Sequence, residues 1–213
     1  EEMAELIPEA DVILGIGAND EIAASIRQAL EGQKVRKFYA PENLEMEGKR
    51  ILVNYPYYAY IRIADGCDNR CSYCIIPYAR GPVRSRCKKE VIDEIKNLAD
   101  AGYREIVLTG IHVASYGKDL ENTSLAELLC EADKIEGIER IRLSSIEPMT
   151  LNSDFVDAIK GCKKLCPQFH ISLQSGCDNT LKRMNRHYTA EEYRHLANKL
   201  REVFPDCTLT TDI

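Results

Sequence analysis

The sequence predicts an α/β fold, a partial (β/α) barrel of parallel strands that follows the end of a separate α/β domain. Strand-like and helix-like runs alternate from Ala59 to the end of the chain, and such alternation indicates parallel strands with right-handed crossovers. Polar segments follow successive strands, as they do at the rim of a barrel. No Gly-x-Gly-x-x-Gly motif follows any strand, which disfavours a dinucleotide-binding sheet.

The first strand is predicted over residues 59–64, where apolar residues recur at period two. The helix over 88–101 places its apolar side chains on one face, and Gly102 ends it. A short buried strand over 105–109 follows. These three elements form the first strand–helix–strand unit.

The later units carry clearer helix signals. Ser124 and Glu127 predict a capping box, and strands are expected over 140–145 and 169–173, with a short helix between them around 155–159. A second capping box opens the last helix, which Pro205 ends before a fifth strand begins at 208. The members of the second box are Thr189 and Glu192.

Residues 1–50 have a different pattern. A strand and glycine turn, "ADVILGIG", precede a short amphipathic helix that ends at Gly32, and 40–50 resemble a linker. We therefore expect two domains, residues 1–50 as the C-terminal part of an N-terminal domain with its linker, and residues 51–213 as the barrel, truncated in or just after its fifth strand.

Composition limits the class of protein. The net charge of −6 disfavours a nucleic-acid platform over the whole surface, and no apolar run is long enough to span a membrane. No secretion signal opens the chain, so nine cysteines indicate thiolate–metal chemistry in a reducing compartment rather than a disulfide framework. We expect a cytoplasmic protein without membrane contact.

Three of these cysteines, Cys67, Cys71 and Cys74, fall within eight positions of "DGCDNRCSYCIIPYARG". A 4Fe–4S cluster takes four ligands, so three thiolates leave one iron open for a substrate or cofactor. Structural zinc is the alternative, and it requires a fourth ligand such as Cys87. The spacing favours the cluster without excluding zinc.

The segment "CDNRCSYC" matches the three-cysteine signature of radical S-adenosylmethionine (SAM) enzymes. With "IIPYARGPVRSR", "LTGIH", "IRLSSIEP", "HISLQSG" and "LKRMNRHYT", the chain resembles the methylthiotransferase branch of that family. The first two of these blocks most resemble the tRNA enzymes that act on N6-threonylcarbamoyladenosine. The sister enzymes that act on isopentenyladenosine in tRNA, or on an aspartate of a ribosomal protein, are alternatives, as is a non-catalytic zinc-binding module.

The resemblance implies a 4Fe–4S cluster on the three cysteines, SAM at its open iron, a tRNA substrate, and an electron donor such as flavodoxin or ferredoxin. The residues that it places near SAM are Tyr73, Thr109, Gly110, Ser145, Glu147, Gln174, Ser175 and Arg183. Thr109 and Ser145 have an alternative role in strand-end hydrogen bonding, and Arg183 and Arg186 in a solvated helix face. His112 and His170 are expected to be structural.

A basic run is a candidate RNA contact, because phosphate binding needs clustered cations. Its members are Arg80, Arg84, Arg86, Lys88 and Lys89. An ordinary charged surface at a helix start is the alternative.

The family that the chain resembles also has a second cluster, bound by cysteines of its N-terminal domain. This chain has no cysteine before Cys67, and its sequence ends before the segments that would match the family's last barrel strand and C-terminal RNA-binding domain. We therefore expect a fragment that binds one cluster.

Overall fold

The computed structural model describes residues 2–40 and 57–213. The boundary expected between residues 50 and 51, and nearly all of the expected linker, lie outside the described residues. Within the described residues, no helix combines the length and apolar character that a membrane span requires.

The first part contains α1 (Glu2–Leu6), β1 (Val12–Leu14), the 3-10 helix η1 (Asn19–Glu21), α2 (Ile22–Leu30) and β2 (Val35–Lys37). Strands β1 and β2 pair in parallel. The glycine turn after β1 lies against β2, because the Gly15 amide donates to the Lys37 carbonyl oxygen at 2.8 Å. The predicted strand and helix are confirmed, whereas α1 and β2 had no clear sequence signal.

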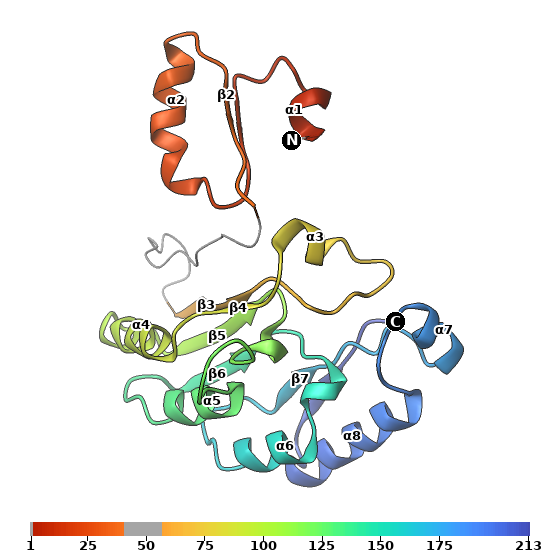
Figure 1. Ribbon diagram of the computed structural model, residues 1–213. Helices are drawn as coiled ribbons and strands as arrows, with labels where there is room; N and C mark the ends of the chain where they lie inside the picture. Colours follow the sequence, from red (N-terminus) through yellow and green to blue (C-terminus); the bar gives the residue numbers. More distant parts are fainter. Residues whose placement is uncertain (1, 41–56) are drawn as a thin grey trace.

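The second part is built on five parallel strands (Figure 1). They are β3 (Tyr58–Asp65), β5 (Glu105–Gly110), β6 (Arg140–Leu143), β7 (Gln168–His170) and β8 (Thr208–Thr210). Strands β3, β5 and β6 form one ladder and β7 and β8 another, and parallel bridges from Ile141 to Leu165 and from Ile146 to Ile171 join the two. All five predicted strands are confirmed, in the order of a partial parallel barrel.

Four helices cover the outer face of these strands (Figure 1). They are α4 (Lys88–Asp100), α5 (Leu125–Ala132), α6 (Ser153–Ile159) and α8 (Ala190–Val203). Both predicted capping boxes are formed, at α5 and α8, and each satisfies amides of the first turn that have no partner inside the helix. The apolar faces of the helices pack against fully buried strand residues such as Ile61, Ile106 and Ile141 in a single core.

Short elements occupy the connections at the carboxyl ends of the strands. The loop after β3 leads into α3 (Ile76–Arg80) and β4 (Arg84–Ser85), which pairs antiparallel with the end of β3. The 3-10 helix η3 (Val113–Ser115) follows β5, η4 (Pro148–Thr150) follows β6, and α7 (Asp178–Arg183) follows β7. The residues expected near SAM lie on these connections or at the last two residues of β5, at one end of the parallel sheet.

Candidate functional site

The cysteine loop is fixed at its start by backbone contacts. Gly66 adopts a φ of +71°, and a Cβ built there would lie only 1.8 Å from the Pro82 carbonyl oxygen. The Cys67 amide donates to the Gly81 carbonyl oxygen at 3.1 Å, and Asp68 Oδ1 accepts from the Val83 amide at 3.2 Å. Only glycine combines this conformation with so close an approach, so the turn that presents the first thiol depends on it.

A buried carboxylate anchors the base of the loop. Asp65 is 4% exposed, and its Oδ1 accepts a hydrogen bond from the Gly66 amide at 2.8 Å. Three guanidinium groups lie 3.5–3.9 Å from its Oδ2 atom. They belong to Arg62, Arg80 and Arg84. A buried charge needs such partners, so these arginines stabilise the Asp65 carboxylate at the start of the cysteine loop.

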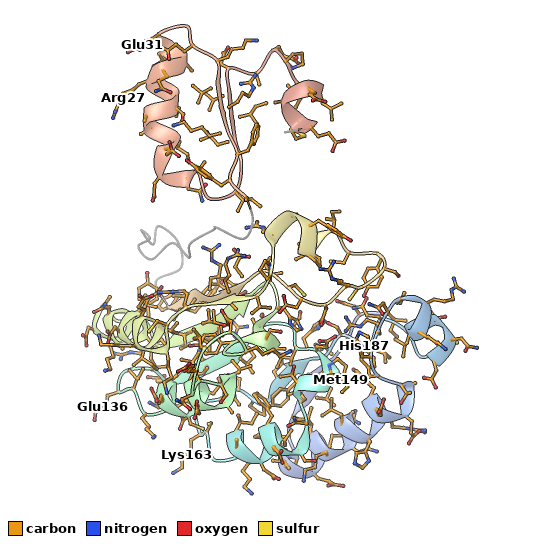
Figure 2. The ribbon with its side chains drawn as sticks, viewed as in Figure 1. Arg27, Glu31, Glu136, Met149, Lys163 and His187 are labelled. Carbon is orange, nitrogen blue, oxygen red and sulfur yellow. The ribbon has the colours of Figure 1, made fainter. Side chains whose placement is uncertain are left out.

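A second carboxylate joins the cysteine loop to the loops after β5 and β6. Glu147, which follows β6, accepts from Asn69 Nδ2 at 2.7 Å and lies 3.1 Å from His112 Nε2, which follows β5. Arg186, beyond α7, lies 3.0 Å from the other oxygen of Glu147. Met149 is two residues from Glu147, and His187 is next to Arg186. Figure 2 shows Met149 and His187 on the same side of this part of the molecule.

The Glu147 carboxylate is strongly stabilised in its charged form. Burial by itself would raise the pKa of Glu147, but hydrogen bonds from His112 and Asn69 and the charge of Arg186 lower that pKa to about 2. Carboxylates that accept several hydrogen bonds show this behaviour. Glu147 is therefore a fixed negative charge at neutral pH, and not an acid or base that exchanges protons.

Arg186 carries the network to a cysteine. Its Nη1 donates to Cys71 Sγ at 3.2 Å, its Nε lies 3.2 Å from Tyr188 Oη, and its guanidinium is 5.1 Å from the centre of the Tyr188 ring. Burial by itself would lower the pKa of Arg186, but the hydrogen bonds with Cys71 and Tyr188 and the charge of Glu147 raise it. The guanidinium is therefore a permanent cation next to the middle cysteine.

The donor set at the loop fits an iron–sulfur cluster. Burial raises the pKa of Cys67, and the nearby thiols of Cys71 and Cys74 raise it further, which reflects three sulfurs grouped on one loop. In the described ranges, no three His, Cys, Asp or Glu side chains come close enough to enclose a single metal ion. A cluster needs no such point, because each thiolate binds a different iron.

The other residues expected near SAM lie at the same end of the sheet. Thr109 and Gly110 end β5, and Gly110 is so close to β3 that an added Cβ would lie 2.5 Å from the Ala64 carbonyl oxygen. Ser145 is exposed just after β6. Gln174 and Ser175 follow β7, and Gln174 has a φ of +66°. Their roles toward a cofactor stay predictions.

Two further residues expected near SAM, Tyr73 and Arg183, are also exposed. Tyr73 is 53% exposed on the cysteine loop, where its ring is accessible to a planar partner. Arg183 is exposed at the end of α7. The arginine whose contacts with the cysteine loop and Glu147 are established is instead Arg186, three residues later.

The basic run does not form one exposed surface. Arg86 is only 7% exposed, and its Nη1 contacts Glu94 Oε2 at 2.5 Å and the Arg62 carbonyl oxygen at 3.3 Å. Arg84 pairs with Asp65 at the base of the cysteine loop. Lys88 pairs with Glu131 and the exposed Lys89 with Asp93. Arg84 and Arg86 thus form ion pairs within the fold, and the RNA contact of the basic run stays a prediction.

Sequence reasoning did not show the contacts of His112 and Arg186. His112 was expected to be structural, and its contacts are with protein side chains: Nε2 lies 3.1 Å from Glu147 Oε2, and Nδ1 lies 2.5 Å from Ser115 Oγ. Arg186 has a solvated-face alternative, but its side chain is 8% exposed. The sequence signal for these two residues was their position alone: His112 follows the end of β5 by two residues, and Arg186 follows the end of α7 by three.

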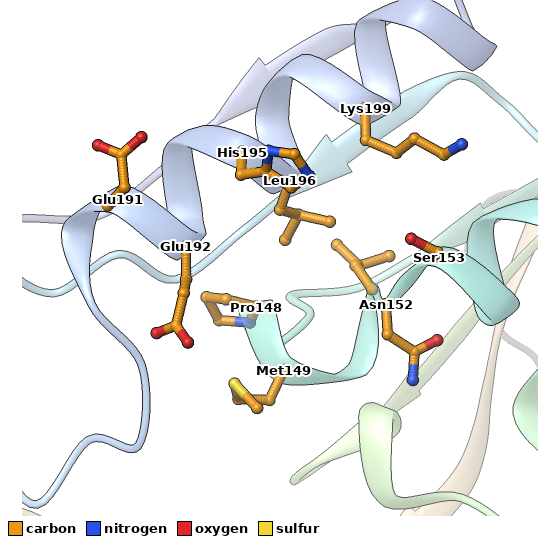
Figure 3. Close-up of a pocket in the computed structure, with 10 residues that line it drawn as sticks. Pro148, Met149, Asn152, Ser153, Glu191, Glu192, His195, Leu196 and Lys199 are labelled. Carbon is orange, nitrogen blue, oxygen red and sulfur yellow. The ribbon is translucent and has the colours of Figure 1, made fainter.

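The remaining features lie away from the cysteine loop. Cys130 Sγ on α5 lies 3.5 Å from Cys162 Sγ, which follows α6, and burial raises the pKa of Cys162 to about 12. A groove of about 470 Å³ separates η4 and the start of α6 from α8 (Figure 3). Met149, Glu192 and His195 are among its walls, and no cysteine lines it. It therefore offers no thiolate ligands for iron.

Comparison with known protein families and curated proteins gives one consistent group. Residues 61–213 match the family model described as "Radical SAM superfamily". The chain is 44% identical over 188 residues to a Clostridium beijerinckii protein named tRNA-2-methylthio-N(6)-dimethylallyladenosine synthase, covering 88% of this chain and 41% of that protein. A Clostridium tetani protein of the same name is 42% identical over 100% of this chain and 48% of its own length. The chain thus spans less than half of these relatives.

Solved structures show the same fold. The radical S-adenosylmethionine methyltransferase TsrM from Kitasatospora setae superposes with a TM-score of 0.57 and 21% identity, over 73% of this chain and 30% of that one. The cobalamin-dependent S-adenosylmethionine radical enzyme OxsB superposes with a TM-score of 0.58 and 16% identity, over 71% and 23% of the two chains. At these identities the likeness concerns the fold alone.

Proposed function

The chain belongs to the radical SAM superfamily, and from this membership we propose that it acts as the core of a tRNA methylthiotransferase. The observation that carries the proposal is the cysteine loop, which places three thiols within eight positions, turns at Gly66, and is contacted by Glu147 at Asn69 and by Arg186 at Cys71. The names of the relatives support the tRNA substrate and the methylthio transfer. Because these relatives are more than twice as long, the activity of the whole protein remains part of the proposal.

In this proposal Cys67, Cys71 and Cys74 hold a 4Fe–4S cluster with one open iron. When bound, the cluster and SAM supply the radical chemistry, as cofactors do in general. The chain itself contributes position and charge. Gly66 lets the loop turn against Pro82, Arg186 supplies a fixed cation beside Cys71, and the ionised Glu147 holds the loops after β3, β5 and α7 together.

The comparisons change the proposed nucleoside. The blocks "IIPYARGPVRSR" and "LTGIH" led us to expect N6-threonylcarbamoyladenosine as the substrate. The relatives reported above are named for N6-dimethylallyladenosine, which is isopentenyladenosine, and their identity extends over 88–100% of the chain. We therefore propose dimethylallyladenosine in tRNA as the substrate. The electron donor, the cytoplasmic location and the assignment of residues 1–50 to an N-terminal domain stay predictions.

Nucleoside analysis tests the substrate. A strain that lacks the complete gene is expected to lose the 2-methylthio group from dimethylallyladenosine while retaining it on threonylcarbamoyladenosine. The reverse pattern would refute the proposed nucleoside and restore the expectation from the sequence. If both nucleosides keep their methylthio groups, the proposed activity is wrong. Complementation with a variant in which Cys71 is replaced by alanine is the matched control, because that gene still encodes every domain.

A further inference from the structure

Three consecutive residues beyond α7 contact three consecutive residues of the cysteine loop. The Met184 carbonyl oxygen accepts from the Ser72 amide at 3.1 Å, Asn185 Nδ2 donates to the Arg70 carbonyl oxygen at 2.7 Å, and Arg186 Nη1 donates to Cys71 Sγ at 3.2 Å. We propose that residues 184–186 are a strap that holds the middle of the cysteine loop in its ligand-binding shape, with Arg186 as the positioning residue for Cys71.

The shape of the strap is set by the end of α7. The Arg186 amide donates to the Leu181 carbonyl oxygen at 2.9 Å and the Asn185 amide to the Lys182 carbonyl oxygen at 3.1 Å, which is the pattern of a Schellman motif. Asn185 takes the left-handed position of this motif, with a φ of +56°. Glycine is the residue most often found there. Asparagine tolerates the conformation and adds an amide side chain, and this amide is the group that reaches Arg70.

The guanidinium of Arg186 is held from several sides. Glu147 Oε1 lies 3.0 Å from Nη2, Tyr188 Oη lies 3.2 Å from Nε, and the side chain is 8% exposed. Tyr188 Oη in turn lies 2.8 Å from the carbonyl oxygens of Ser172 and Leu173, beyond β7. The planar fork of arginine donates along three directions at once, which a lysine ammonium on a flexible stem does not reproduce. These contacts fix the position of the Arg186 guanidinium beside Cys71.

The strap has a direct consequence for metal binding. The loop between Gly66 and Ile75 is attached at its start by Gly81 and Val83, and the strap supplies contacts at its middle. A binding site that is already ordered loses less conformational entropy when a ligand binds. We therefore expect the strap to slow the loss of iron, a step of the inference that rests on the proposed function. Its effect on the loop of the metal-free chain does not rest on it.

Two variants test the strap. Asn185→Gly keeps the backbone conformation of the helix end and removes the side-chain contact to Arg70, whereas Arg186→Lys keeps the charge and removes the fork. Lys182→Gln, at an exposed position of α7, is the control. Hydrogen exchange of amides 70–74 is measured on the metal-free chain. We expect exchange about tenfold faster in both variants and unchanged in the control, because each lost hydrogen bond shifts local opening by about that factor.

Iron retention is measured on the same proteins after anaerobic reconstitution and exposure to an iron chelator. The variants are expected to lose iron several-fold faster than the wild type and the control. Wild-type exchange and wild-type iron loss in both variants would overturn the strap. If the variants exchange faster but the wild-type chain binds no iron, the strap stands and the proposed function fails. If all proteins bind and keep iron equally, the function stands and the strap's role in retention fails.

Discussion

The buried charge of Glu147 gives the sharpest prediction. The pKa of Glu147 falls from 4.5 to about 2 on folding, and this difference corresponds to about 3 kcal/mol of stability. A lowered pKa contributes stability that is fully present above pH 4.5 and is lost as the pH falls toward 2. Glu147→Gln removes this contribution and leaves Arg186 without its counter-ion. We expect a loss of ~3–5 kcal/mol in the free energy of unfolding at pH 7.

Urea unfolding of the metal-free chain at pH 7 and pH 3 measures the effect. The difference in the free energy of unfolding between the wild type and Glu147→Gln should be smaller at pH 3 than at pH 7. At pH 3 the wild type has already lost part of the stability that ionised Glu147 contributes. Glu191→Gln is the control, and this exposed residue of α8 should change stability by no more than ~0.5 kcal/mol. Adding Arg186→Met to Glu147→Gln should restore part of the loss, since the unpaired cation is removed. A Glu147→Gln variant as stable as the control at pH 7 would refute this reasoning.

Three further predictions concern other parts of the fold. Gly66→Ala should lower the free energy of unfolding by at least ~2 kcal/mol in thermal unfolding and abolish iron binding, because Gly66 has a φ of +71° and the new Cβ would lie 1.8 Å from a carbonyl oxygen. Gly161→Ala is the control and should change little, because open space surrounds Gly161. Equal effects of the two substitutions would contradict this prediction. Diamide should oxidise Cys130 and Cys162, whose Sγ atoms lie 3.5 Å apart, to a disulfide that stabilises the chain by ~3–4 kcal/mol. If the thiols of Cys130 and Cys162 still react with maleimide after this treatment, the prediction is wrong. Ser124→Ala should destabilise by ~1 kcal/mol in urea unfolding through loss of the capping box, and an unchanged midpoint would show that the box contributes nothing.

Local signals explain how much of the fold was predictable. The strands and the helices α4, α5 and α8 follow from apolar periodicity, and both capping boxes from pairs three residues apart, because these interactions lie within one element. The two-residue strand β4 and the five-residue helix α3 are too short to show a period. Strand β4 pairs with the end of β3, and Arg80 of α3 forms an ion pair with Asp65 of β3, so both elements have tertiary contacts that a sequence pattern does not show.

The site was predictable only in part. Cys67, Cys71 and Cys74 are adjacent in sequence, so their spacing is visible, and Glu147 was found through the resemblance of its segment to a family. The contact of Arg186 with Cys71 joins residues 115 positions apart, and nothing in the sequence indicates that the end of α7 turns back onto the loop. For the same reason, the burial of Arg86 against Glu94 could not be foreseen from a run of basic residues.

The most direct test of the central claim is Mössbauer spectroscopy of the anaerobically reconstituted chain, together with iron and sulfide analysis, with and without SAM. The account predicts about four irons and four sulfides per chain, and one iron whose spectrum changes when SAM is added. Zinc in place of iron, about eight irons per chain, or four irons that are all insensitive to SAM because a fourth side chain completes the coordination would contradict it.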